Sequence, residues 1–171
     1  MRPSFDELYV EHFTFVWRNL RRLGVAEAAL SDAAQDVFLV VHRRLPDFEP
    51  RAAVRSWLYS IAVRVARQHR RGARRKPVEA LDDTTFCPAA PELGPEQLAE
   101  HSEALRRLLA LLEGLDDAKR EAFVLSELEN LTAPEIAAIL GVNVNTIYAR
   151  VRAARRELES ALTRLGRERE A

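Results

Sequence analysis

The pattern that most restricts the fold of this chain lies towards its C-terminus, from Leu131 to Leu162, and reads LTAPEIAAILGVNVNTIYARVRAARRELESAL. Thr132 and Glu135 have the T-x-x-E spacing of a capping box, which predicts the start of a helix. Gly141 can adopt the left-handed backbone that a sharp turn between two helices requires. Asn143 can then cap a second helix. Apolar residues recur along that helix at three- and four-residue intervals: Ile147, Val151, Ala154 and Leu158. Together these features predict a helix-turn-helix.

The opposite face of the second helix is polar and basic. In such motifs, residues near the start of the second helix reach base edges in the major groove, and basic side chains hold phosphates. The alternative is an ordinary helical hairpin with a solvated basic face. The agreement of cap, glycine and apolar spacing favours DNA binding. The candidate DNA contacts are Asn145, Thr146, Tyr148, Ala149, Arg150, Arg152, Arg155 and Arg156.

The rest of the chain also has a helical pattern. Leu, Ala, Arg and Glu dominate the composition, and all four favour helix. Apolar residues at helical spacing predict a first helix from Phe5 that ends at Gly24. A second helix is expected with Ser31 as its N-cap, stopping before Pro46, and a third starts near Val54. The sequence therefore predicts an all-α protein.

Charge divides the chain, although Lys+Arg and Asp+Glu are equal at 26 each. From Arg64 to Lys76 the sequence RVARQHRRGARRK holds basic residues and no acid, whereas the next charged residues are all acidic and lie among several prolines. A stretch rich in acids and prolines, like the one after Lys76, favours an extended, solvated segment. We therefore expect two small helical domains, at residues 1–76 and 98–165, joined by a flexible acidic linker at residues 77–97.

The basic stretch continues the third predicted helix. A charged run is usually only a solvated face, but acids are missing here, and a basic patch is the electrostatic signature of a phosphate-backbone partner. On the other faces of this helix, Trp57 has the spacing of a core residue, and Tyr59, opposite to it, is a weaker candidate for DNA contact. The stronger candidates for phosphate and single-strand contact are Arg64, Arg67, Gln68 and Arg71.

Several classes of function find no support in the sequence. The one cysteine, Cys87, cannot form an internal disulfide, and the four histidines lack metal-ligand spacing, so we expect neither a metal nor a cofactor. No nucleophile–base constellation indicates an enzyme. The N-terminus lacks a signal-peptide pattern and no apolar run is long enough to span a bilayer, so a cytoplasmic protein without membrane insertion is expected.

Taken together, the two halves resemble the extracytoplasmic-function group of bacterial sigma factors. The C-terminal half is similar to region 4 of that family, with an "L-S-x-x-E-I-A-x-x-L-G" helix followed by a recognition helix. In the N-terminal half, SDAAQDVFLVVHRRLPDFEP is similar to the "D-x-x-Q-E/D-x-F" helix of region 2, and VRSWLYSIAVRVARQHRRGARR to its "W-L-x-x-I-A-x-N" helix. The chain departs from these patterns at Arg64, Tyr148 and Ala149, so we expect its base preferences to differ from the usual ones of the family.

The resemblance implies a protein that directs RNA polymerase core to specific promoters. It implies that Asp32, Gln35 and Asp36 dock on core polymerase, and that the loop holding Phe48 receives a flipped-out base of the downstream promoter element. For Phe48 the alternative is a loop residue folded back on the core. The implied partners are RNA polymerase core, promoter DNA and an anti-sigma factor. The rival hypothesis is a stand-alone helix-turn-helix regulator that binds duplex DNA.

Overall fold

The computed structural model describes residues 3–49, 53–75 and 95–170, and these form helices and short helical turns without any strand. The chain separates into two compact units, Met1–Ala90 and Pro91–Ala171. The all-α prediction is confirmed. Most of the predicted linker, including Cys87, lies outside the described residues, and the helix that follows begins at Pro95.

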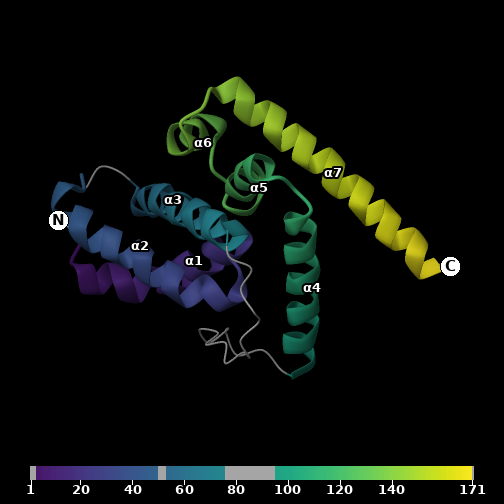
Figure 1. The fold of residues 1–171 in the computed structure, drawn as a ribbon, viewed down its shortest axis with the longest axis horizontal. Coiled ribbons are helices and arrows are strands. Elements are labelled where there is room, and N and C mark those ends of the chain that lie inside the picture. Colours follow the sequence, from purple (N-terminus) through teal and green to yellow (C-terminus); the bar gives the residue numbers. More distant parts are fainter. Residues whose placement is uncertain (1–2, 50–52, 76–94, 171) are drawn as a thin grey trace. The chain divides into compact units, whose positions relative to one another are not determined.

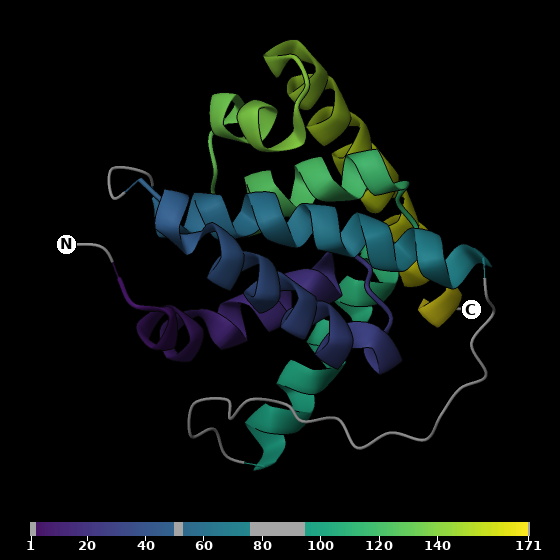
Figure 2. The same cartoon turned by 60° about the vertical axis from the view of Figure 1, so that its left-hand side comes forward.

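The first unit is a bundle of three helices, α1 (Phe5–Arg22), α2 (Leu30–Arg44) and α3 (Val54–Arg75), each packed against the other two (Figure 1 and Figure 2). Two 3₁₀ turns, η1 (Glu27–Ala29) and η2 (Leu45–Asp47), precede and follow α2. Aliphatic side chains from all three helices and from the α1–α2 connection fill the centre. Leu20, Leu23, Leu30, Val37 and Leu58 are almost fully buried.

Helices α1 and α2 begin in different ways. Ser4 and Glu7 form a capping box at α1, and the hydrogen bonds from Ser4 lower the pKa of the Glu7 carboxyl. The prediction that Ser31 caps α2 is wrong, because α2 starts at Leu30 behind the η1 turn, with Ala29 at the cap position. Leu30 is completely buried, so packing determines where this helix begins.

Helix α3 has a buried face wider than a simple amphipathic stripe, because it packs against both α1 and α2. Tyr59 is only 1% exposed, and its ring centroid lies 4.8 Å from that of Phe15 in α1. The prediction that Tyr59 contacts DNA is therefore wrong for this structure. The buried residues of this face are Leu58, Tyr59, Ile61, Ala62, Val63, Val65 and Ala66.

The second unit contains α4 (Pro95–Glu113), α5 (Asp117–Phe123), α6 (Ala133–Leu140) and α7 (Val144–Glu170). Between α5 and α6 lies a π-helical turn, η3 (Val124–Leu128). Helices α4, α5 and α6 all pack against α7, the longest helix in Figure 1. The core of the unit includes Leu112, Leu115, Ala122, Val124, Leu125, Ile136, Ala137, Leu140, Ile147, Val151, Ala154 and Leu158.

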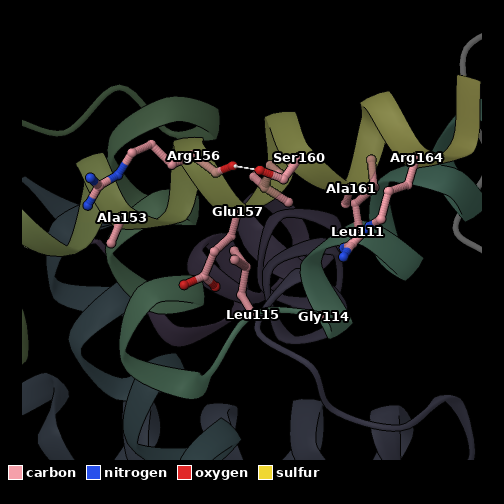
Figure 3. Close-up of a pocket in the computed structure, with 10 residues that line it drawn as sticks. Leu111, Gly114, Leu115, Ala153, Arg156, Glu157, Ser160, Ala161 and Arg164 are labelled. Atoms are coloured by element: carbon pink, nitrogen blue, oxygen red, sulfur yellow. Dashed lines mark hydrogen bonds between the residues drawn. The ribbon is translucent and has the colours of Figure 1, made fainter.

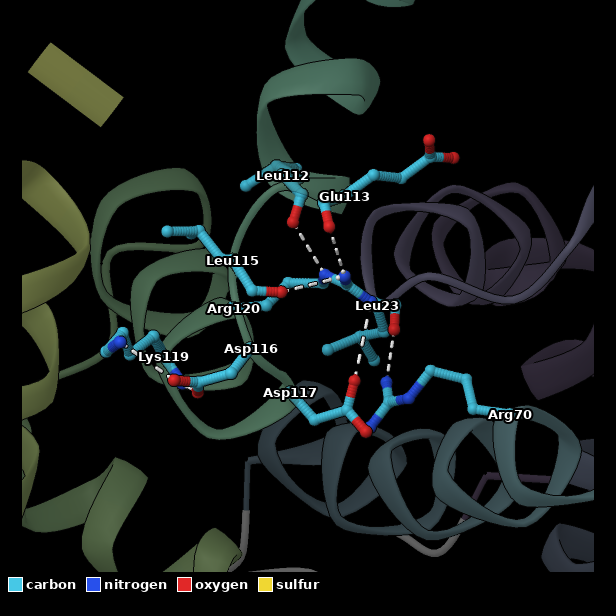
Figure 4. A network of polar contacts seen from close by, with 9 residues as sticks. All are labelled: Leu23, Arg70, Leu112, Glu113, Leu115, Asp116, Asp117, Lys119 and Arg120. Atoms are coloured by element: carbon cyan, nitrogen blue, oxygen red, sulfur yellow. Dashed lines mark hydrogen bonds and ion pairs between the residues drawn. The ribbon is translucent and has the colours of Figure 1, made fainter. Parts of the chain in front are cut away.

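In each unit a buried arginine donates hydrogen bonds to backbone carbonyl oxygens at the end of a neighbouring helix. These carbonyls lie in the last turn of the helix or just after it. Arg120 of α5 donates from Nε to the Leu112 carbonyl at 2.8 Å, and from Nη2 to those of Leu115 and Glu113 at 3.0 and 3.2 Å (Figure 4). In the first unit, Arg70 of α3 donates to the Leu23 carbonyl, just after α1. The last carbonyls of a helix have no partner within it, so these arginines act as C-terminal caps.

Candidate nucleic-acid interface

The start of α6 and the turn between α6 and α7 both have the predicted geometry. The backbone N–H of Thr132 donates to the Glu135 carboxylate at 2.8 Å, and the Thr132 hydroxyl donates to it at 2.6 Å. These bonds lower the pKa of Glu135. Gly141 has φ 68° and ψ 39°, a left-handed conformation, and Asn143 accepts from the backbone N–H of Asn145 at 2.8 Å. The helix-turn-helix prediction is confirmed.

Most of the predicted contact residues on α7 lie away from the core. Tyr148 is 59% exposed, and Asn145, Ala149, Arg152 and Arg156 are also exposed. Thr146 and Arg150 are partly exposed at the edges of this face. The structure therefore brings these seven side chains onto one accessible side of the helix.

Arg155 is also exposed, but its guanidinium is engaged within the protein. Its Nη2 donates to Glu127 in η3 at 2.8 Å. That hydrogen bond is the largest of the effects that lower the pKa of Glu127. A second ion pair joins Glu157 of α7 to Lys119 of α5 at 2.6 Å. Sequence reasoning missed both pairs, because their partners lie 28 and 38 residues apart and share no local pattern.

The basic half of α3 presents the predicted stripe. Arg64, Gln68 and Arg71 are exposed and Arg67 is partly exposed. The other basic side chains described here turn inward: Arg70 is buried as a helix cap, and His69 lies 2.8 Å from Asp36 of α2. The exposed face of α3 from Arg64 to Arg71 therefore carries positive charge without a carboxylate of its own helix.

Phe48 follows the η2 turn and folds back onto the first unit. Its side chain is 3% exposed, and its ring centroid lies 4.7 Å from that of Trp57. In this structure the ring is a core residue and is not open to a base. Of the two hypotheses for Phe48, its placement matches the folded-back one.

The three predicted docking residues of α2 do not form one uniform face. Asp32 is exposed, whereas Asp36 bonds to His69 of α3. Gln35 lines a groove of about 660 Å³ between α1 and α2. That groove has aromatic walls, because its other lining residues are Phe5, Tyr9, Phe13, Ser31, Phe38, Leu39 and His42.

A second groove, of about 450 Å³, lies between the end of α4 and the C-terminal half of α7 (Figure 3). Leu111 and Leu115 line one side, and Leu158, Ala161 and Arg164 line the other. The Ser160 hydroxyl beside it donates to the Arg156 carbonyl at 2.8 Å. The groove thus borders the middle of α7 and includes Arg156, the last of the predicted DNA contacts.

The described parts of the chain show neither a metal-binding cluster nor a membrane-spanning helix. Among residues 3–49, 53–75 and 95–170, no group of three or more His, Cys, Asp or Glu side chains is placed to hold a metal ion. Within the same residues, no helix combines the length and the apolar character needed to cross a membrane.

Comparison with known proteins matches each unit to a known domain family. Residues 8–76 match the family model for sigma-70 region 2, and residues 105–158 match the model for sigma-70 region 4. The chain is 31% identical over 165 residues to RNA polymerase sigma factor CnrH of Cupriavidus metallidurans, covering 93% of this chain and 86% of the relative. It is also 31% identical over 143 residues to the ECF RNA polymerase sigma-E factor of Escherichia coli K12, covering 80% and 75%.

A solved structure gives the same result. The structure of CnrH in complex with the cytosolic domain of CnrY superposes with a TM-score of 0.67 at 28% identity, covering 93% of this chain and 87% of that one. Both domains, their order along the chain and most of its length are therefore shared with these proteins. The chain belongs to the extracytoplasmic-function group of RNA polymerase sigma factors, which direct core polymerase to promoters to initiate transcription.

Proposed function

We propose that the two units divide promoter recognition between two basic helices. The domain at residues 98–165 places the start of α7 in the major groove of the upstream element. The domain at residues 1–76 uses α3 to hold the single strand of the downstream element as it opens. One observation carries this proposal: α3 and α7 each bury an apolar face in their own unit and leave a basic or polar face accessible.

The contacts proposed for α3 are Arg64, Arg67, Gln68 and Arg71. Their side chains can neutralise phosphates, which supplies affinity without sequence selectivity. The contacts proposed for α7 are Asn145, Thr146, Tyr148, Ala149, Arg150, Arg152 and Arg156. In this proposal the residues in the first two turns of α7 reach base edges, whereas Arg152 and Arg156, farther along the helix, contact phosphates.

Docking on core polymerase is assigned to α2. Asp32 is exposed and Gln35 opens into the aromatic groove between α1 and α2. Tyr9 and Leu39, at 42% and 47% exposed, give that groove an apolar lining that a partner would cover. Asp36 is the third proposed docking residue, and its carboxylate also orients His69 of α3.

An anti-sigma factor is the second proposed protein partner. CnrH, whose structure is similar, was solved in complex with the cytosolic domain of CnrY. A cytoplasmic site of action follows for a protein that works on core polymerase and promoter DNA. RNA synthesis is the chemistry of the polymerase, so this chain needs no catalytic group or cofactor of its own.

Run-off transcription tests the proposed function against the stand-alone regulator. The template is the DNA upstream of the chain's own gene, with the chain alone, core polymerase alone, or both. We expect transcripts only from the mixture, and weak, salt-sensitive binding of duplex DNA by the chain alone, since one helix-turn-helix has a small interface. Tight sequence-specific binding by the free chain, without a transcript on adding core, would favour the regulator.

The division of labour predicts separable defects. Arg152→Ala should weaken binding of the upstream duplex by roughly tenfold, as expected for the loss of one charged DNA contact. Arg71→Ala should leave that binding near the parental level and reduce strand opening, measured by permanganate reactivity of unpaired thymines. Arg167→Ala, an exposed arginine at the far end of α7, is the matched control. Equal loss of binding and opening in both variants would contradict the assignment.

A further inference from the structure

Helix α7 is held on its two flanks by ion pairs of opposite polarity. On one flank, α7 supplies the cation, Arg155, and η3 supplies the anion, Glu127, at 2.8 Å. On the other flank, α7 supplies the anion, Glu157, and α5 supplies the cation, Lys119, at 2.6 Å. Lys119 also contacts Asp116, the N-cap of α5, at 2.8 Å.

The helical repeat explains why the pairs lie on opposite sides. Ile147, Val151, Ala154 and Leu158 form the buried line of α7. At 3.6 residues per turn, Arg155 and Glu157 fall on either side of that line, each roughly a quarter of a turn away. A rotation of α7 about its axis carries one of these two side chains toward the core and the other away from it. Both ion pairs can therefore stay short only near one rotation of the helix.

The polarity of the pairs fixes more than rotation. If α7 packed the other way round, Arg155 would face Lys119 and Glu157 would face Glu127. Each of these pairs has like charges, which repel. Glu127 is held in place as well, because it also accepts from the Ser126 hydroxyl at 2.9 Å, and its side chain is 29% exposed. The two pairs thus favour one orientation of α7 on α5 and η3.

We propose that Arg155 is a positioning residue: through Glu127 it fixes the rotation of the reading face of α7, and it is not a phosphate ligand. The inference rests on the proposed role of α7 in reading the upstream element. A phosphate at Arg155 would have to displace a carboxylate that already holds the guanidinium. Arg152 and Arg156, which flank it in sequence, are exposed and better placed for phosphate contact.

A charge swap separates positioning from DNA contact. The probe is a duplex that the parent holoenzyme, the chain bound to core polymerase, selects from a random-sequence library. Its affinity and base preference are measured for Arg155→Glu, for Glu127→Arg and for the double variant, which has the parental net charge. Each single reversal should lower affinity about fivefold, the scale of one exposed ion pair, and alter the preferred bases. The double variant should recover both to within about twofold.

The matched control places the same reversal on the outward face. Arg152→Glu should weaken binding, and adding Glu127→Arg should not restore it, because Arg152 is not the partner of Glu127. If the double variant of Glu127 and Arg155 binds as poorly as Arg155→Glu alone, Arg155 touches DNA and the inference is overturned. Parental affinity in both single variants would overturn it too. If the parent holoenzyme selects no sequence, the proposed function fails, and the inference with it.

Discussion

Replacement of Arg120 by Met is expected to destabilise the second unit by about 3 kcal/mol, because it removes the guanidinium hydrogen bonds to the carbonyls of Leu112, Glu113 and Leu115. Of these, the Leu112 carbonyl keeps the backbone N–H of Leu115 as a donor. Methionine keeps most of the apolar stem, so the loss comes from the cap and not from a cavity. The guanidinium now serves the carbonyls of Leu112, Glu113 and Leu115 at 2.8 to 3.2 Å. Lysine should recover only part of the loss, because its compact ammonium cannot reproduce the planar fork of arginine.

The measurement uses two probes of unfolding. Both tryptophans, Trp17 and Trp57, belong to the first unit, so their fluorescence reports on that unit, whereas far-UV circular dichroism reports on the helices of both. Arg120→Met should shift the circular dichroism transition by about 10 °C or more and leave the fluorescence transition near its parental midpoint. Arg106→Met, at an exposed position in α4, is the control and should change little. An unchanged circular dichroism transition would mean that the cap contributes nothing.

Phe48→Ala is expected to destabilise the first unit by about 3 kcal/mol, the scale of removing a buried aromatic ring from a core. Phe48 is 3% exposed and contacts Trp57, so tryptophan fluorescence should report the change directly. Phe48→Leu keeps the site apolar and should cost less than about 1.5 kcal/mol. Val10→Ala, at a residue 82% exposed in α1, is the control and should be neutral.

The same variants distinguish the two hypotheses for Phe48. If the ring is a core residue, Phe48→Leu should open promoter DNA as well as the parent at temperatures where it stays folded. If the ring instead leaves the core to receive a flipped base, Phe48→Leu should be stable but defective in opening, because an aliphatic side chain cannot stack on a base. Permanganate reactivity, measured well below the unfolding midpoint, separates these outcomes.

Local signals in the sequence predicted the helix-turn-helix well. The capping box of Thr132 and Glu135 and the left-handed Gly141 depend on neighbours within a few residues, so they could be found without the fold. The exposed stripe of α3 could also be predicted from the sequence, because Arg64, Gln68 and Arg71 follow the helical repeat. The π-helical turn after α5 has no such signal and was missed.

Tertiary packing decided what local patterns could not. The helical repeat predicts an open face for Tyr59 because this residue lies opposite Trp57, but α1 covers that face and Phe15 packs on it. Arg70 and Arg120 belong to a residue type that is usually exposed, and only the approach of another helix end explains their burial. The start of α2 at Leu30 instead of Ser31 has the same cause, since burial of Leu30 outweighs a side-chain cap.

The length of α7 has a mechanical consequence. It runs for 27 residues as one helix, about 40 Å at 1.5 Å per residue, and the reading face occupies only its first half. Because an uninterrupted helix bends little, its second half acts as a lever arm on the first. A tilt of about 10° would move the far end by roughly 7 Å over that length. Leu111 at the end of α4 and Leu115 just after it line the groove beside Leu158 and Ala161, so their packing helps to set the orientation of residues several turns away on α7.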